Sequence, residues 1–258
     1  MKEEILEELL RLERKLNIKI LYAVESGSRA WGFESKDSDW DVRFIYIHPL
    51  DWYLAIDEKK DSIEEMLPND IDLSGWELRK ALKLLRKSNP PLLEWLNSPL
   101  IYYEKYKTAQ SLRVLSARYF SPKSCMHHYL NMAISNYKQY LQAERVKLKK
   151  YFYVLRPILA CQWVDITNTM PPVEFQKLLN SQIKDKKLMK EIENLLLRKK
   201  QGEELKEELK IEVIHKYLDE KIEYYRQYAE HLNKNSNQPL TDELNELFRL
   251  ALKEVYNS

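Results

Sequence analysis

Apolar side chains at the start of the chain follow a helical spacing and then give way to short β-rich runs. Within residues 5–16, large aliphatic residues recur every three or four positions, which predicts a helix. The run IKILYAV at 18–24 is rich in β-branched and aromatic residues and predicts a strand. Three later runs have the same character: VRFIYI at 42–47, DIDLS at 70–74 and LIYYE at 100–104. Strands and short helices are therefore expected to alternate here.

Beyond about residue 107 the pattern changes to long stretches rich in Leu, Lys, Glu and Tyr, with one glycine and no convincing strand. Helices are predicted at 108–118, 123–149, 151–166, 173–199, 204–231 and 241–256. The fold class expected is α+β, with a short mixed sheet in a first domain, 1–107, followed by an all-helical second domain, 108–258.

Bulk composition restricts the function only loosely. The chain has 42 basic and 40 acidic residues, so any affinity for nucleic acid must come from local patches. No run of eighteen apolar residues and no signal-peptide pattern is present, and we expect a cytoplasmic protein with no membrane partner. Cys125 and Cys161 form no C-x-x-C pair and are expected to be reduced structural thiols.

The stretch SGSRAWGFESKDSDWDVRFIYI, residues 26–47, concentrates chemistry: it holds two of the four glycines and three aspartates within five positions. Asp39 and Asp41 are separated by one residue at the start of a predicted strand, so both side chains lie on one face. Two carboxylates about 4 Å apart repel by roughly 4 kcal/mol at an effective dielectric of 20. A cation is expected between them, and Mg²⁺ (or Mn²⁺) suits oxygen ligands.

Gly27 and Ser28 follow the strand that precedes these aspartates. Glycine permits a tight turn and close approach of the backbone to a ligand, and Ser28 supplies a hydroxyl and an N–H at the start of a short helix. This arrangement is typical of a phosphate cradle. Beside a carboxylate-held metal it would bind the β- and γ-phosphates of a nucleoside triphosphate.

Gly27-Ser28, a ten-residue spacer and Asp39-Trp40-Asp41 resemble the signature of the DNA polymerase β-type nucleotidyltransferase superfamily. The longer runs GSRAWGFESKDSDWDVRFIY and DIDLSGWELRKALKLLRKSNPPLLEWLNSPLIYY resemble the predicted nucleotidyltransferases associated with RNA repair (RlaP/YcgL-like). The resemblance implies a polymerase-β-like first domain with a third carboxylate on a later strand. Asp72 matches that position, and Asp70 is the alternative if the register differs by two.

The resemblance also implies a reaction: transfer of a nucleoside monophosphate from an NTP such as ATP to a hydroxyl acceptor, with release of pyrophosphate. Asp39, Asp41 and Asp72 would hold two metal ions, and Asp72 would act as ligand and also as proton acceptor. The acceptor implied is an RNA 3′ end, with an RNA ligase or another RNA-repair protein as partner. Three alternatives stay open: a protein hydroxyl, as in adenylylating antitoxins, a small molecule of the aminoglycoside kind, and an inactive nucleotide- or RNA-binding regulator.

Basic residues supply the remaining candidates. Arg29 and Arg43 flank the aspartates and are expected to bind nucleotide, and Arg43 shares the strand face of Asp41. In the second domain four residues recur at intervals of four, four and three and predict one helical stripe for substrate binding: Arg145, Lys149, Tyr153 and Arg156. A merely solvated helix face is the alternative for this stripe. Domain 1–107 is thus the expected catalytic part, and 108–258 the substrate-binding part.

Overall fold

The computed structural model describes residues 1–203, 207–232 and 241–256. By their internal contacts these residues form two compact units. The first unit contains residues 1–30, 39–119 and 241–256, and the second contains 31–38 and 120–232. The first unit thus takes its last helix from the far end of the sequence, and the second takes a loop from within the first. The division into a catalytic domain, 1–107, and a substrate-binding domain, 108–258, stays a prediction.

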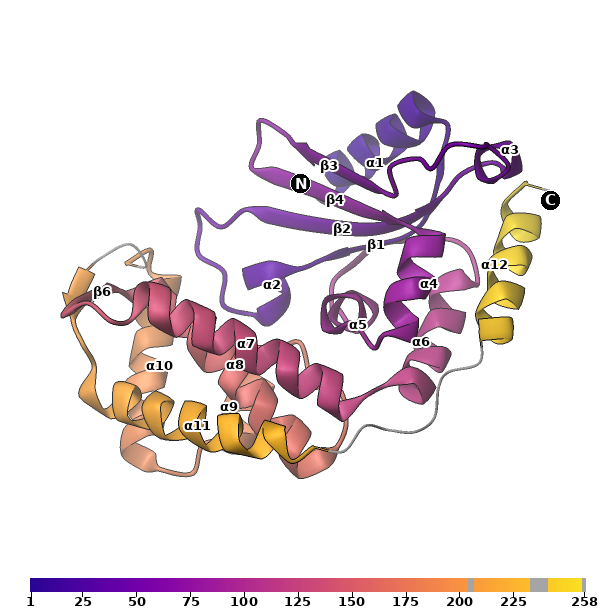
Figure 1. Ribbon diagram of the computed structural model, residues 1–258. Coiled ribbons are helices and arrows are strands. Elements are labelled where there is room, and N and C mark those ends of the chain that lie inside the picture. The colour runs from indigo at the N-terminus through magenta and orange to yellow at the C-terminus, as the bar shows by residue number, and fades with distance from the viewer. Residues whose placement is uncertain (204–206, 233–240, 257–258) are drawn as a thin grey trace. The chain divides into compact units, whose positions relative to one another are not determined.

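A five-stranded mixed sheet forms the centre of the first unit (Figure 1). Its strands are β1 (Lys19–Glu25), β2 (Trp40–Ile47), β3 (Ser62–Met66), β4 (Ile71–Glu77) and β5 (Ile101–Glu104). Their order is β3-β4-β2-β1-β5, in which β2 and β4 are parallel and the other neighbours are antiparallel. The predicted α+β class is confirmed. The edge strand β3 was not predicted, because its sequence SIEEM contains two acidic residues and has no apolar face.

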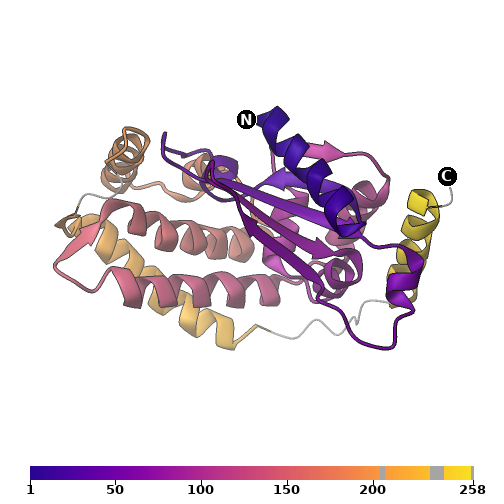
Figure 2. The same cartoon turned by 90° about the horizontal axis from the view of Figure 1, so that it is seen from above.

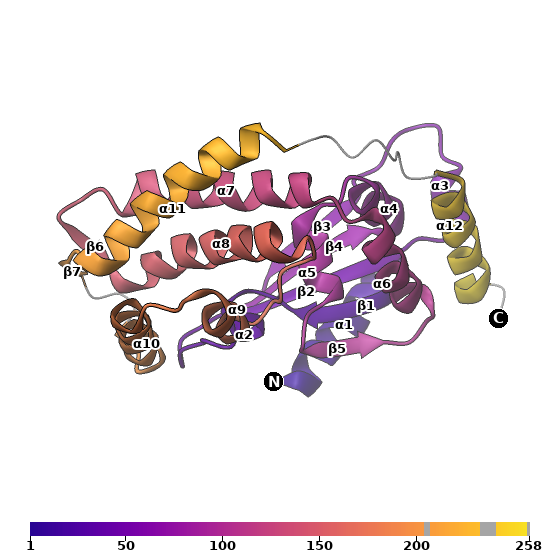
Figure 3. The same cartoon turned by 90° about the horizontal axis from the view of Figure 1, so that it is seen from below.

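Helices cover both faces of this sheet. They are α1 (Lys2–Leu16), α2 (Gly27–Trp31), α3 (Leu50–Tyr53), α4 (Leu78–Arg86), α5 (Pro90–Leu96), α6 (Thr108–Tyr119) and α12 (Thr241–Tyr256). Helix α1 lies over one face, where Ile5, Leu9 and Leu12 are buried (Figure 2). Helices α4 to α6 pack on the other face (Figure 3). The two layers bury the strands that position the aspartates.

Helix α12 packs against α4 and α6 and completes the first unit. The Phe248 ring lies edge-on to Tyr53, with ring centroids 4.9 Å apart. The Tyr256 hydroxyl donates to the carbonyl oxygen of Ile47, at the end of β2, over 3.1 Å. The predicted helix at 241–256 is thus confirmed, and it belongs to the unit that contains the sheet.

The second unit consists of helices and one small ladder. Its elements are α7 (Pro122–Tyr140), β6 (Arg145–Lys147), α8 (Leu148–Thr167), α9 (Phe175–Gln182), α10 (Lys186–Lys200), β7 (Glu207–Leu209) and α11 (Glu212–Glu230). Helices α7 and α8 lie side by side (Figure 3), and Phe33 from the loop 31–38 is buried against Phe152 and Phe175. Within the described ranges no helix is long and apolar enough to cross a membrane.

Three expectations for the second unit are wrong. It is not entirely helical, since β6 and β7 pair antiparallel. The helix predicted at 123–149 ends at Tyr140, where the chain turns into β6. The helix predicted at 173–199 is interrupted between Gln182 and Lys186, where Asp185 begins α10 by accepting a hydrogen bond from the Leu188 N–H. Short polar interruptions leave the apolar period nearly intact, so the sequence pattern does not reveal them. The helix predicted at 204–231 corresponds to α11 only over residues 212–230. Residues 207–209 of the predicted range form β7, and residues 204–206 lie outside the described residues.

Candidate functional site

Two of the three predicted carboxylates lie side by side because β2 and β4 are parallel neighbours. Their register places Asp41 opposite Asp72. Asp39 comes just before β2, one residue from Trp40, the first residue of the strand. Asp70 lies in the turn before β4 with a φ of 55°, and its carbonyl oxygen accepts the Trp40 N–H over 2.7 Å. The structure therefore brings Asp72, and not the alternative Asp70, onto the strand beside Asp41.

Arg43 lies between these two carboxylates. Its Nη2 donates to Asp41 Oδ1 and to Asp72 Oδ2, each over 2.8 Å. Its Nη1 donates to the carbonyl oxygens of Asp72, over 2.9 Å, and Val42, over 3.3 Å. A guanidinium thus lies between Asp41 and Asp72, and the metal ion expected between Asp39 and Asp41 stays a prediction. Burial raises the pKa of Asp41, Arg43 opposes that rise, and Asp72 and Asp39 add to it.

Gly27 lies directly against the carboxylate of Asp41. Its φ of +58° is in the left-handed region, which glycine adopts without steric cost. A Cβ at this position would lie 1.9 Å from Asp41 Oδ2 and 2.8 Å from its Cγ. The neighbouring Ser26 N–H donates to the Asp41 carbonyl oxygen over 2.8 Å. Glycine is therefore required here both by the backbone conformation and by the close approach of Asp41.

The other predicted nucleotide-binding residues lie in or beside the short helix α2. Ser28 is its second residue and is partly exposed. The Arg29 guanidinium lies 3.6 Å from the ring centroid of Trp40, and its Nε donates to the Asp39 carbonyl oxygen over 3.1 Å. Arg29 thus ties α2 to the segment that contains Asp39 and Asp41.

Sequence reasoning missed Glu25, the last residue of β1. Its side chain is fully buried. Oε1 accepts the Asp41 N–H over 2.9 Å, and Oε2 accepts the hydroxyl of Tyr102 on β5. Burial raises the pKa of Glu25 to about 7. The signal was present in the sequence: one acid ends the apolar run KILYAVE, two residues before Gly27.

Glu25 should make the metal-free protein less stable as pH rises. Its pKa is near 4.5 in the unfolded chain and about 7 in the folded one, so between these values the folded state binds more protons. The free energy of unfolding should fall over that window by about 3 kcal/mol, and the loss should persist above pH 7. Urea unfolding in EDTA from pH 4.5 to 8 measures the slope.

Glu25→Gln is the matched variant for this titration, since its amide can accept the Asp41 N–H and donate to Tyr102. The pH slope should flatten in this variant. An unchanged slope would mean that another group causes it.

The predicted stripe of Arg145, Lys149, Tyr153 and Arg156 does not exist as one helical face. Arg145 lies on β6, where its Nη2 donates to the Glu207 carbonyl oxygen over 2.8 Å. The other three lie on α8, and Arg156 is buried, with its guanidinium 4.5 Å from the ring centroid of Trp31. The stripe fails because the chain turns before α8, and because Arg156 points into the aromatic core.

Arg156 is therefore expected to contribute mainly to stability. Arg156→Glu should lower the free energy of unfolding by about 3 kcal/mol or more, because it buries an acid against Trp31 in place of a stacked cation. Lys149→Glu, a partly exposed charge reversal in the first turn of the same helix, should change it by about 0.5 kcal/mol or less. Urea denaturation of both variants measures the difference, and equal losses would contradict the buried role of Arg156.

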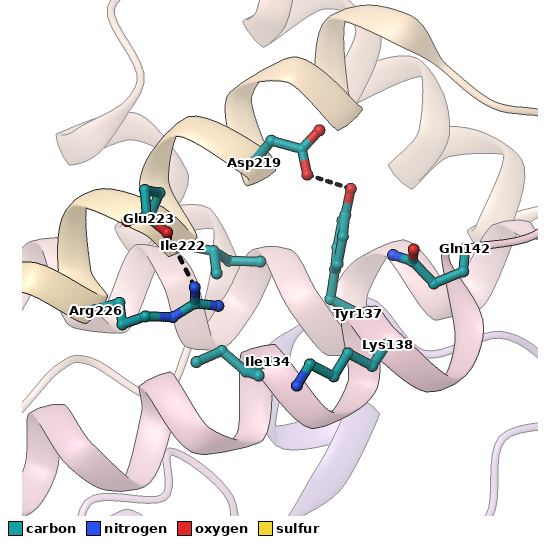
Figure 4. Close-up of a pocket in the computed structure, with 8 residues that line it drawn as sticks. All are labelled: Ile134, Tyr137, Lys138, Gln142, Asp219, Ile222, Glu223 and Arg226. Atoms are coloured by element: carbon teal, nitrogen blue, oxygen red, sulfur yellow. Dashed lines mark hydrogen bonds and ion pairs between the residues drawn. The ribbon is translucent and has the colours of Figure 1, made fainter.

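A pocket of about 260 Å³ opens between α7 and α11 in the second unit (Figure 4). Its lining residues are Ile134, Tyr137, Lys138, Gln142, Asp219, Ile222, Glu223 and Arg226. The acids are engaged: Asp219 accepts the Tyr137 hydroxyl, and Glu223 pairs with Arg226 over 3.0 Å. None of these residues was predicted from the sequence, because helix–helix pairing decides which side chains meet.

The carboxylates near Gly27 fit a metal ion only with help from a ligand. Among the described residues, no group of three or more His, Cys, Asp or Glu side chains is arranged to hold a metal. Mg²⁺, however, is often bound by one or two carboxylates together with substrate phosphates. Asp41 fits this smaller requirement, since Arg43 binds only its Oδ1, and Asp39 is the carboxylate that would join it at such an ion.

Comparisons with known proteins identify a family for this chain. The family model described as RlaP, RNA repair pathway DNA polymerase beta family, matches residues 1–250. The chain is 51% identical over 256 residues to the uncharacterized protein YcgL of Bacillus subtilis (strain 168), a match that covers 99% of this chain and 98% of that protein. A solved nucleotidyltransferase-like protein from Exiguobacterium sibiricum 255-15 matches with a TM-score of 0.36 at 15% identity, covering 97% of this chain and 87% of that one.

Proposed function

Because the chain belongs to the RNA repair pathway DNA polymerase beta family, we propose that it transfers a nucleoside monophosphate from an NTP to a hydroxyl acceptor. The observation that supports this most directly is the pairing of Asp41 with Asp72 across parallel strands, with the bare backbone of Gly27 against Asp41. Carboxylates beside a glycine turn suit a triphosphate and its metal, because Mg²⁺ is commonly held by one or two carboxylates together with substrate phosphates.

Each residue has a stated role in this proposal. Asp39 and Asp41 would hold Mg²⁺ or Mn²⁺, which when bound neutralises charge on the triphosphate. The Gly27-Ser28 turn would bind phosphate oxygens, and Arg29 would add a positive charge beside them. Asp72 would accept a hydrogen bond from the acceptor hydroxyl and take its proton as the oxygen bonds to the α-phosphorus and pyrophosphate leaves.

The fixed positions of the catalytic groups account for most of the rate of nucleotidyl transfer that we expect. Glu25 fixes the backbone N–H of Asp41, and Arg43 fixes the carboxylates of Asp41 and Asp72 relative to each other. Groups held in this way need little reorganisation during the reaction, which is the main source of rate in phosphoryl-group chemistry.

The acceptor proposed is an RNA 3′ end, and an RNA ligase or another RNA-repair protein is the proposed partner. The family description supports an RNA-repair role. A net charge of +2 requires that RNA be bound by local groups, and Arg145 on β6 and Lys149 on α8 are at least partly exposed. A protein hydroxyl and a small-molecule hydroxyl are the competing acceptors.

Labelling tests the reaction and the acceptor together. Purified protein is incubated with each α-³²P-NTP, Mg²⁺ or Mn²⁺ and total cellular RNA, beside the Asp39→Asn/Asp41→Asn variant, and resolved on denaturing gels. Label on RNA with the wild type alone is the expected result. Label on protein would replace the RNA acceptor by a protein one, and absence of label on any acceptor, small molecules included, would contradict the transferase proposal.

RNA binding should depend on Arg145 and Lys149. The Arg145→Glu/Lys149→Glu variant should bind RNA more weakly and with a smaller dependence on salt, because fewer phosphate counterions are released. Filter binding at several salt concentrations measures the slope. Arg156 is left intact, since it is buried and its reversal should destabilise the second unit. Lys216→Glu, an exposed change on α11, is the control. If both variants lose RNA affinity equally, Arg145 and Lys149 do not form a specific RNA-binding site.

A further inference from the structure

One guanidinium is shared by two carboxylates of the candidate site, and this determines how many metal ions the site can take. We propose that the site binds a single divalent cation at Asp39 and Asp41, and that Arg43 permanently occupies the place of a second ion beside Asp72. The use of this arrangement in nucleotidyl transfer rests on the proposed function, whereas the number of ions does not.

The distances leave no room for an ion bound to both Asp41 Oδ1 and Asp72 Oδ2. Arg43 Nη2 lies 2.8 Å from Asp41 Oδ1 and 2.8 Å from Asp72 Oδ2. A Mg²⁺ ion bound to the same two oxygens, at about 2.0–2.1 Å from each, would need the space that this nitrogen fills. The guanidinium and an ion on these two oxygens therefore exclude each other.

Arg43 is held in place by more than its attraction to the carboxylates. Nη1 donates to the carbonyl oxygens of Asp72 and Val42, and the side chain is only 17% exposed. A metal that displaced it would leave these carbonyl oxygens without the arginine and would force a rigid, always-charged group to find new partners. The guanidinium is thus part of the β2–β4 pair and not a loosely recruited counterion.

The charges also balance with one ion. The carboxylates of Asp39, Asp41 and Asp72 together with the Arg43 guanidinium leave two negative charges, which one divalent cation neutralises. Asp41 Oδ2, which Arg43 does not bind, lies against Gly27. A metal at Asp39 and Asp41 therefore lies toward the proposed triphosphate turn, whereas Arg43 alone orients Asp72.

Electron paramagnetic resonance of bound Mn²⁺ tests the number of ions without any turnover. The full chain is loaded with Mn²⁺ and a non-transferable α,β-methylene ATP analogue and frozen. Two Mn²⁺ ions in a shared site lie about 3.5–4 Å apart and give a coupled spectrum, whereas one gives an isolated six-line signal. The wild type is expected to give the isolated signal only.

Removal of the guanidinium should admit the second ion. Arg43→Gln is expected to give the coupled spectrum, and Arg43→Lys, which keeps the charge, the isolated one. Arg113→Gln is the matched control, because Arg113 likewise binds a carboxylate, Glu104, and a backbone carbonyl, that of Leu96, away from the aspartates. This control should resemble the wild type.

A coupled spectrum in the wild type would overturn the proposal, and so would an isolated signal in a folded Arg43→Gln. If Arg43→Gln does not fold, the spectra of the wild type and of Arg43→Lys decide. Isolated signals from both proteins would support a positive side chain in place of the second ion, and a coupled spectrum from either protein would contradict it. Failure of the labelling assay with an isolated Mn²⁺ signal would reject the transferase reaction and leave the single-ion site intact.

Discussion

Asp41→Asn is expected to lower nucleotidyl transfer by about a thousandfold or more. Asp41 is the carboxylate on which the site converges: Arg43 binds its Oδ1, its Oδ2 lies against Gly27, and Glu25 accepts its backbone N–H. The amide keeps the shape but loses the charge that would hold the metal against the triphosphate, a contribution of several kcal/mol to the barrier. Single-turnover transfer from an α-³²P-NTP measures the loss.

This loss should come without loss of the fold. Burial already raises the pKa of Asp41, so a neutral side chain suits its surroundings, and the free energy of unfolding should change by no more than about 1 kcal/mol. Asp51→Asn, an exposed substitution on α3, should leave transfer unchanged. Transfer by Asp41→Asn within tenfold of the wild type would show that Asp41 holds no essential metal.

Gly27→Ala is expected to abolish transfer and nucleotide binding together. The new Cβ would lie 1.9 Å from Asp41 Oδ2, and this contact is under 3.0 Å, so the carboxylate must move. The left-handed φ of +58° adds a backbone cost of about 1–2 kcal/mol. The rise in melting temperature that Mg²⁺ and NTP cause in the wild type should disappear.

Gly32→Ala separates the effect of the contact with Asp41 from the cost of a positive φ. Gly32 also has a positive φ, of +80°, but a Cβ there would meet nothing within 4 Å. It should therefore show the backbone cost, about 1–2 kcal/mol in urea unfolding, while it keeps the nucleotide-dependent rise in melting temperature. If both glycine variants lose that rise, backbone strain and not contact with Asp41 explains the effect.

Local patterns predicted the candidate site because its parts are close in the sequence. Asp39, Asp41 and Arg43 lie in or directly before one strand, so a period of two is enough to predict a common face for them. Gly27 follows the preceding strand, and all four residues lie within positions 27–43. Asp72 required the further step that β2 and β4 are neighbours, which the family resemblance supplied and the register confirms.

What the sequence did not reveal depends on tertiary contacts. Glu25 looks like the last residue of an apolar strand, and only the pairing of β1 with β2 and β5 makes it the acceptor for Asp41 and Tyr102. Arg156 has the spacing of a surface stripe, yet packing against Trp31 decides its burial. Periodicity assigns residues to a face, but it does not say which face meets the core.

Helix α12 is synthesised long after the other elements of the unit that it completes. The sheet and α4 to α6 leave the ribosome first, but their remaining partner, with Phe248 and Tyr256, is made more than a hundred residues later. At cellular elongation rates this delay is on the order of ten seconds. During that interval the surfaces of α4 and α6 that α12 covers are open to chaperones or proteases, and a premature stop codon near residue 240 would damage the unit that contains the aspartates while sparing the helices that precede it.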